Sequence, residues 1–191
     1  MAIVIKHACY CLLIANVGLQ NVLAQDRRFY EFTAVDSHGS IIDLRRYQGK
    51  VTLVTNVASY CGYTESHYHQ LVELQREHES WLNILAFPCN QFGTQEPEDV
   101  HTIRREMNRK FRVNFEIFEK VDVLGDNVTP MWRYLIEESK TTPQWNFYKY
   151  LVDAHGQVIG AWGPKADVYH IKPYVEDAIN DAKSFHSREE L

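Results

Sequence analysis

VTLVTNV, at residues 51–57, is a nearly uncharged run rich in β-branched residues, and ASYCGYT follows it at residues 58–64. Such a run is typical of a strand that is buried on both faces of a parallel sheet. Apolar residues then recur with helical spacing from Thr64 to Ser80, and a second buried strand over residues 82–87 stops at Pro88. We therefore expect a β-α-β unit, which should have a right-handed crossover.

The flanking segments extend this unit into an α/β pattern. Two strand-like runs at residues 29–35 and 41–44 surround a turn, which predicts an N-terminal β-hairpin. Further expected elements are a helix from about Pro97, a short strand at 115–118, a helix from Thr129–Pro130, a hairpin of strands 147–152 and 157–162, and a last helix over 171–182. This order predicts a mixed central sheet with helices on both faces.

Composition places the chain among ordinary globular proteins. Its 191 residues are 45% hydrophobic and 24% charged, enough for one domain with a full core, which excludes a disordered, collagen-like or coiled-coil chain. The net charge of -5 and the lack of a basic run argue against a nucleic-acid partner. Because no histidine pair has the spacing of helical metal ligands beside a glutamate, we expect no metal site.

The two ends of the chain carry targeting patterns. Residues 1–24 contain an apolar stretch and end in Ala24, which predicts a cleaved secretory signal peptide; an uncleaved anchor and a structural segment are the alternatives. The sequence REEL at residues 188–191 resembles endoplasmic-reticulum retrieval tails. We thus expect a catalytic domain at residues 25–187 in the endoplasmic-reticulum lumen, or secreted if the tail is not read. Cleavage would leave Cys61 and Cys89 in the mature chain.

Cys61 stands between the first buried strand and the helix that follows it. Chemistry collects at this edge of parallel strands, and a helix N-terminus favours a thiolate. An inert buried cysteine is the alternative interpretation. A dithiol oxidoreductase would need a second cysteine at Thr64, and a phosphatase would need arginine in the loop. A papain-like hydrolase would need a further cysteine and a His–Asn pair. A one-cysteine peroxide reductase is the class that remains.

Three motifs, met in this order along the chain, resemble those of the glutathione peroxidase family. They are NVASYCGYT at 56–64, LAFPCNQFG at 85–93 and WNFYKYLV at 145–152. The resemblance covers about residues 29–182, and the two ends of the chain point to the endoplasmic-reticulum members. It implies a thioredoxin-like fold, a peroxidase of the EC 1.11.1 type, a monomer, and a catalytic set composed of Cys61, Gln91, Trp145 and Asn146.

The expected chemistry needs a thiol co-substrate and no bound cofactor. The Cys61 thiolate attacks hydrogen peroxide, with lipid hydroperoxides as a second substrate class, and becomes a sulfenic acid. The amide of Gln91, the indole N–H of Trp145 and an N–H of Asn146 would stabilise the leaving oxygen. Taken singly, Trp145 is better interpreted as a core aromatic and Gln91 as a solvated loop residue; the shared motifs favour the catalytic interpretation.

The reduction of the sulfenic acid leaves several alternatives open. Cys89 follows the neighbouring strand and could be a resolving thiol, a target of partner thiols or a buried spectator. The resemblance suggests protein disulfide isomerase as the electron donor, with glutathione as the alternative. A luminal redox sensor or chaperone-like partner of disulfide isomerases is the second functional hypothesis, and a non-catalytic binding module is the third. Asn127 begins a glycosylation sequon, although Thr129 there could be a plain helix cap.

Overall fold

A computed structural model describes residues 28–189, and a five-stranded mixed sheet forms their centre. Strands β4 and β5 run parallel to β3, whereas β6 and β7 continue the sheet in antiparallel pairs. The strand order is β5-β4-β3-β6-β7. The bounds are β3 (Val51–Val57), β4 (Leu82–Pro88), β5 (Glu116–Ile117), β6 (Lys149–Val152) and β7 (Val158–Trp162). The predicted α/β class with a mixed sheet is confirmed.

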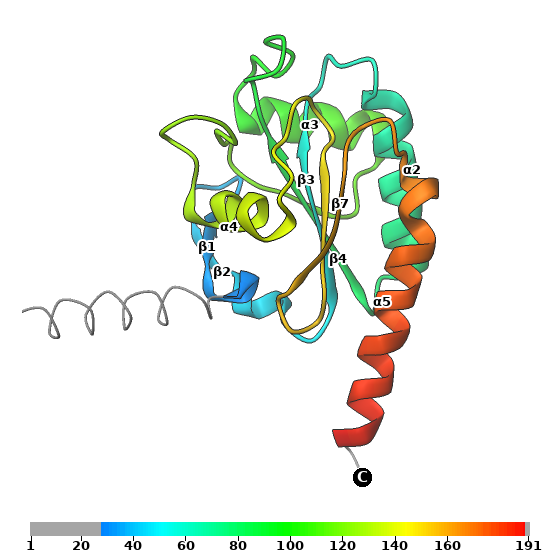
Figure 1. The fold of residues 1–191 in the computed structure, drawn as a ribbon. Coiled ribbons are helices and arrows are strands. Elements are labelled where there is room, and N and C mark those ends of the chain that lie inside the picture. The colour runs from blue at the N-terminus through cyan, green and yellow to red at the C-terminus, as the bar shows by residue number, and fades with distance from the viewer. Residues whose placement is uncertain (1–27, 190–191) are drawn as a thin grey trace, which may run out of the picture.

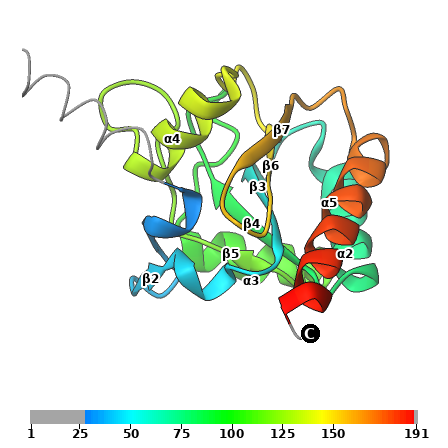
Figure 2. The ribbon, with the colours of Figure 1, turned by 60° about the horizontal axis from the view of Figure 1, so that its bottom comes forward.

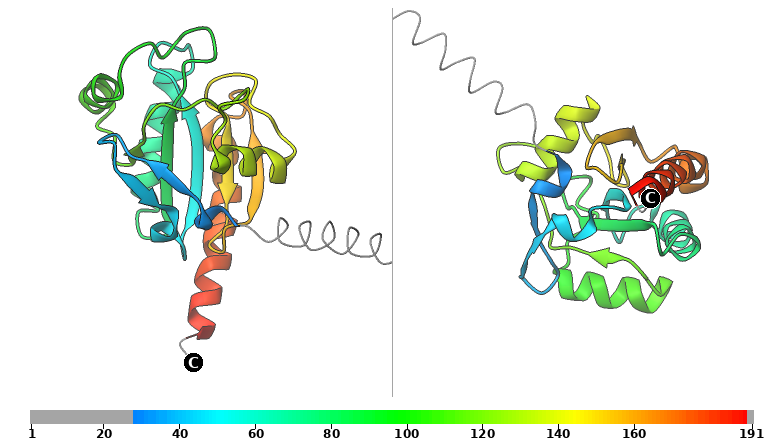
Figure 3. Two further views of the ribbon diagram at one scale, coloured as in Figure 1. Left: turned by 90° about the vertical axis from the view of Figure 1, so that its left-hand side faces the viewer. Right: turned by 90° about the horizontal axis from the view of Figure 1, so that it is seen from below.

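Both faces of the sheet are covered, which is why every residue of β3 is buried. Helices α2 (Thr64–Glu77), α3 (Val100–Phe111) and α5 (Val168–Glu189) pack on one face. Helix α4 (Pro130–Ser139) and the N-terminal segment cover the other face (Figure 1; Figure 3). Side chains alternate between the two layers, as the pleat of a strand requires.

The N-terminal hairpin is confirmed, but its first strand starts later than predicted. Strands β1 (Thr33–Val35) and β2 (Ile41–Asp43) pair in antiparallel register, and the short helix η2 (Leu44–Tyr47) follows. The segment η1 (Phe29–Glu31) is a 3-10 turn instead of strand. Its Tyr30 is buried, and the hydroxyl donates to the carbonyl oxygen of Lys50 at 2.7 Å. That contact holds the start of the domain against Lys50, the residue directly before β3.

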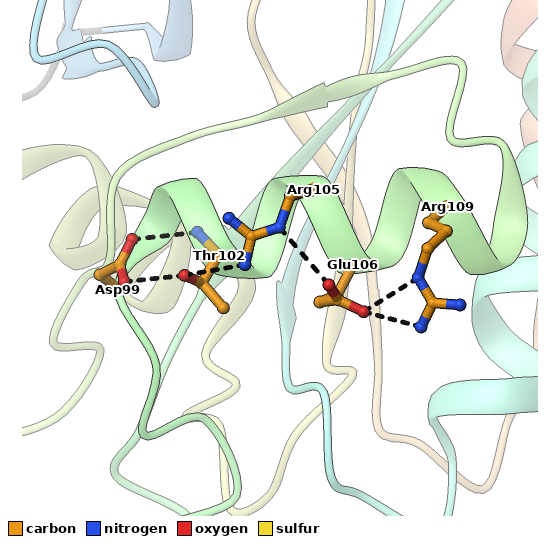
Figure 4. A network of polar contacts seen from close by, with 5 residues as sticks. All are labelled: Asp99, Thr102, Arg105, Glu106 and Arg109. Atoms are coloured by element: carbon orange, nitrogen blue, oxygen red, sulfur yellow. Dashed lines mark hydrogen bonds and ion pairs between the residues drawn. The ribbon is translucent and has the colours of Figure 1, made fainter.

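Helix α3 begins at Val100 and not at Pro97, because Asp99 caps it. Asp99 Oδ1 accepts the backbone N–H of Thr102 at 2.9 Å, and Oδ2 accepts the Thr102 hydroxyl at 2.9 Å. Glu106 binds Arg109 at 2.8 Å further along the exposed side of the helix (Figure 4). The cap satisfies N–H groups that the first turn would otherwise leave unpaired.

Helices α2 and α5 lie side by side and run parallel (Figure 2). Tyr169 at the start of α5 donates to Glu73 at 2.7 Å, and Lys172 contacts Glu77 at 2.5 Å one turn later. The final helix extends from Val168 to Glu189, well beyond the predicted range. Its last turns project past the sheet, at the end opposite to the start of α2 (Figure 1). Within residues 28–189, no helix is both long and apolar enough to cross a membrane.

Candidate active site

Cys61 lies in the turn that joins β3 to the N-terminus of α2. Its backbone N–H donates to Thr64 Oγ1 at 3.1 Å, and that hydroxyl donates to the carbonyl oxygen of Ala58 at 2.6 Å. The Thr64 N–H in turn donates to the Cys61 carbonyl at 3.0 Å. The Cys61 residue is 8% exposed and packs in the core cluster shared with α2 and α3. Cys61 thus lies at the carboxyl end of β3, directly before the N-terminus of α2.

The segment before β6 is held in a strained conformation. Phe147 has a φ of 64°, a left-handed value that is costly for a bulky side chain. Asn56, buried on β3, fixes this segment by three contacts. Its carbonyl accepts the Phe147 N–H at 2.7 Å, its Nδ2 donates to the Trp145 carbonyl at 3.1 Å, and its Oδ1 accepts the Tyr148 N–H at 2.9 Å. Strained residues that are held in this way concentrate at functional sites.

Two buried basic side chains tie this segment to the loop after β7. Lys149 Nζ donates to the carbonyl oxygens of Phe147 at 2.7 Å and Gly163 at 3.4 Å. His67 Nε2 contacts the carbonyl of Pro164 at 3.1 Å, so the proton of the neutral ring belongs on Nε2. Burial lowers the pKa of Lys149 to about 7, and burial together with the Lys149 charge lowers the pKa of His67 to about 4.

Asn146 and Gln95 meet beside the Cys61 turn. Asn146 is fully buried, and its Nδ2 donates to Gln95 Oε1 at 3.0 Å. The Gln95 carbonyl accepts the backbone N–H of Tyr60, the residue before Cys61, at 3.0 Å. Trp145 closes the group, because a Cβ on Gly93 would lie 3.4 Å from its ring and 3.5 Å from the Gln95 side chain. The structure thus places Trp145 and Asn146 beside Gln95, which binds the Cys61 turn.

Gln95 is a residue that the sequence reasoning missed. The motif quoted from the sequence stopped at Gly93, two residues too early, although Gln95 belongs to the same loop. The sequence does carry a signal, since two glutamines, Gln91 and Gln95, follow β4 in the same loop.

Gln91, the predicted amide donor, is not part of this group. Its Nε2 donates to the Leu124 carbonyl at 2.9 Å, and its Oε1 accepts the N–H groups of Val123 at 2.8 Å and Leu124 at 2.9 Å. Gly93 and Thr94 both have positive φ, 64° and 51°, so a left-handed turn separates the two glutamines. The side chain of Gln91 therefore fastens the loop before α4, and the structure does not bring it to Cys61.

Cys89 lies in the other layer of the core. It is fully buried among the residues that pack toward α4, whereas Cys61 packs toward α2 and α3. Its Sγ donates to Gln91 Oε1 at 3.7 Å, and burial raises the pKa of the thiol. Both cysteines are free thiols. The two thiols pack in different core clusters and are not joined in the described conformation.

A groove of about 820 Å³ opens beside Trp145, whose side chain is 38% exposed. Its walls come from the Cys61 turn, the segment before β6 and the loop after β7, and their aromatic members are Tyr63, Trp145, Tyr148 and Trp162. Lys165 is the charged residue in the described lining. No three metal-binding side chains gather anywhere in residues 28–189.

Comparison with known proteins identifies the family. A family model described as Glutathione peroxidase matches residues 29–136, more than half of the chain. The chain belongs to the glutathione peroxidase family. Among relatives of this glutathione peroxidase, glutathione peroxidase 7 of Mus musculus is 44% identical over 155 residues, which are 81% of this chain and 83% of the relative. Probable glutathione peroxidase 8-B of Xenopus laevis is 41% identical over 168 residues, 87% of this chain and 80% of the relative.

Solved structures agree with this assignment. The crystal structure of Trgpx in apo form superposes with a TM-score of 0.68 at 31% identity and covers 82% of this chain and 97% of that one. A thiol:disulfide interchange protein of the thioredoxin family from Chlorobium tepidum has a TM-score of 0.59 at 17% identity, covering 78% and 92%. The latter likeness concerns the fold alone. The thioredoxin-like fold is confirmed, and family membership makes the protein an oxidoreductase of the EC 1.11.1 type.

Proposed function

We propose that this protein is a thiol peroxidase that reduces hydrogen peroxide, and lipid hydroperoxides as a second substrate class, with Cys61 as its nucleophile. The observation that carries the proposal is the convergence of Gln95, Trp145 and Asn146 on the Cys61 turn. No cofactor takes part, and a thiol reductant is the co-substrate.

The Cys61 thiolate attacks one peroxide oxygen. A bond forms between Sγ and that oxygen, the O–O bond breaks, and the sulfur becomes a sulfenic acid while the leaving oxygen takes a proton. Donors that point toward this oxygen lower the barrier. Because Gln95 Oε1 already accepts from Asn146, the Gln95 side chain is oriented with its NH2 group free to donate. We therefore assign the amide role to Gln95 rather than Gln91, beside the indole N–H of Trp145.

We propose that a dithiol protein of the disulfide-isomerase class returns the sulfenic acid to the thiol. Its first thiol forms a mixed disulfide with Cys61 and releases water, and its second thiol then attacks that disulfide, which frees the Cys61 thiol and leaves the partner oxidised. The groove beside Trp145 is open and aromatic, which suits an extended peptide that presents a cysteine. Glutathione is the weaker candidate. It carries two carboxylates, and the described lining of the groove offers them one charged side chain, that of Lys165. The burial of Cys89 in the opposite layer favours a partner thiol over Cys89 as the group that resolves Cys61 in the described conformation.

We propose the endoplasmic-reticulum lumen as the location and a monomer as the working form. The predicted signal peptide lies outside the described residues, and so do the last two residues of the predicted tail. Asn127 is exposed in the loop before α4, and Thr129 precedes that helix without a capping hydrogen bond from its side chain. These features are compatible with glycosylation of Asn127, which stays a prediction.

The test is hydrogen-peroxide consumption with reduced protein disulfide isomerase or with glutathione as the donor. Wild type should turn over repeatedly, and Cys61→Ser should not. A single oxidation of Cys61 without turnover on either donor would overturn the proposal in favour of the redox sensor. Normal function of Cys61→Ser would leave only a binding module.

A further inference from the structure

Glu96 is a fully buried carboxyl directly behind the turn that carries Cys61. It lies in the loop between β4 and α3 and is 0% exposed. Its Oε2 accepts the backbone N–H of Ser59, two residues before Cys61. The preceding residue, Gln95, holds Tyr60 in the same way through its carbonyl. Gln95 and Glu96 therefore bind the two backbone N–H groups that directly precede Cys61.

No cation binds this carboxyl group among the described residues. Lys120 approaches, but its Nζ donates to the backbone oxygens of Glu96 at 2.8 Å and Glu98 at 2.7 Å. The described hydrogen bonds to the Glu96 carboxyl group come from Ser59 alone, and the nearby Tyr68 hydroxyl is buried without a described partner. A carboxyl that is buried with hydrogen bonds from one neutral residue and no bound cation is costly to ionise.

The surroundings of Glu96 contain several groups that feel its charge. Tyr68 on α2 lies close enough for a Glu96 carboxylate to raise its pKa, and the same charge contributes to the raised pKa of Cys89 on the far side of the sheet. Glu98 adds a like charge, and Lys120 an opposite one. Burial is the largest effect, and it raises the pKa of Glu96 to about 7.

We propose that Glu96 is a positioning residue that sets the charge behind Cys61: its neutral carboxyl favours the Cys61 thiolate, and its carboxylate opposes it. The inference rests on the proposed peroxidase function, in which that thiolate attacks the peroxide. A carboxylate bound to the Ser59 N–H and a thiolate two residues later would place two negative charges around one buried turn, and we expect the formation of one to oppose the formation of the other.

The effect of Glu96 on Cys61 depends on pH. Below about pH 7 Glu96 is neutral and leaves the thiolate unopposed, whereas at higher pH its carboxylate resists further ionisation of Cys61. The rise of the Cys61 rate with pH is therefore broadened and displaced to higher pH. When peroxide converts the thiolate to a neutral sulfenic acid, the negative charge on sulfur is lost, and Glu96 ionises more easily in the oxidised protein.

The experiment measures second-order rate constants of Cys61 between pH 5 and pH 9, with hydrogen peroxide and separately with iodoacetamide. Glu96→Gln keeps an oxygen for the Ser59 N–H but removes the charge. Glu98→Gln removes a carboxylate two residues away and is the matched control. We expect Glu96→Gln to equal wild type at the acid end, to move the midpoint of the curve to lower pH, and to react about three- to tenfold faster near pH 7.5. Glu98→Gln should follow wild type.

Superimposable curves for Glu96→Gln and wild type would overturn the inference, as would a loss by the same factor at every pH, which indicates a purely structural role. Iodoacetamide separates this question from the proposed function, because alkylation reports the thiolate even if peroxide is not a substrate. If Glu96→Gln does not fold, infrared spectroscopy of wild type and Cys61→Ser decides. The acid band of Glu96 should titrate at lower pH in Cys61→Ser, and an unchanged titration contradicts the coupling.

Discussion

Cys61 and Cys89 follow two neighbouring parallel strands, yet the sheet gives them opposite surroundings. Cys61 sits at the open N-terminus of α2 and is joined through the turn to Gln95 and Asn146. Cys89 is sealed in the layer below α4, where its thiol contacts Gln91. Two glutamines of the same loop thus serve the two cysteines differently: Gln91 contacts the Cys89 thiol, and Gln95 binds the turn that carries Cys61. Proximity at one edge of a sheet does not give two thiols the same chemistry, because the pleat and the turn decide which layer each one enters.

The largest expected effect is the difference in peroxide turnover between variants of the two cysteines. Cys61→Ser should lower peroxide turnover by at least about a thousandfold, since the nucleophile is lost. Cys89→Ser should leave the oxidation of Cys61 within about twofold of wild type, because the thiol lies in the other layer. Stopped-flow measurement of the peroxide step, followed by steady-state turnover with each reductant, checks both. Loss of turnover in Cys89→Ser with an intact first step would show that Cys89 does resolve Cys61 after a movement of the backbone.

The second expected effect concerns thiol labelling. In the native reduced protein, Cys61 should react with iodoacetamide at least about a hundredfold faster than Cys89, whose pKa is raised by burial. Mass spectrometry of partly labelled protein would give both rates, and denatured protein is the control in which the difference should vanish. Equal labelling in the native state would mean that the layer around Cys89 opens readily.

The third expected effect contrasts the two glutamines. Gln95→Ala should slow Cys61 oxidation by about 10- to 100-fold, because it removes a donor and releases Asn146. Gln91→Ala should change that rate by no more than about threefold and instead destabilise the fold by about 1 kcal/mol, since the N–H groups of Val123 and Leu124 lose their acceptor. Rate constants and denaturant unfolding measured on both variants decide, and the reverse pattern would restore Gln91 to the active site.

The smallest expected effect is on stability at low pH, on the Cys61 side of the sheet. The pKa of His67 is lowered from 6.5 to about 4 in the fold, so the unfolded state binds its proton first as the pH falls. The stability that the neutral ring provides is complete above pH 6.5 and is lost as the pH falls from 6.5 to about 4. We expect a loss of about 2 kcal/mol between pH 7 and pH 5.

The control for this measurement is His67→Gln, which does not titrate and keeps a donor for the Pro164 carbonyl. Its unfolding free energy, measured with denaturant across the same range, should show a correspondingly flatter dependence on pH. If the unfolding free energies of the variant and wild type depend on pH in the same way, then the pKa of His67 is not lowered in the folded protein, and the prediction is wrong.

The sheet and its helices could be predicted because hydrophobic periodicity reports burial directly, as in the fully buried run from Val51 to Val57. The role of Gln91 could not be predicted. A left-handed turn at Gly93 and Thr94 separates Gln91 from Gln95, and the sequence does not reveal that backbone conformation. The late start of β1 has a similar cause, since the anchoring of Tyr30 to Lys50 joins residues that lie far apart along the chain. The motifs single out Trp145 and Asn146, and the structure places both beside Gln95, but the left-handed backbone at Phe147 next to them is visible only in three dimensions.

The parallel course of α2 and α5 has a practical consequence for handling the protein. Both helices start at the edge where Cys61 lies, and the 22 residues of α5 carry the chain about 33 Å toward the opposite pole. A biotin or electrode linker attached near Arg188 would hold the molecule with its reactive edge turned outward. Immobilised in this orientation, the protein would leave Trp145 and the groove beside it open to a large redox partner in solution.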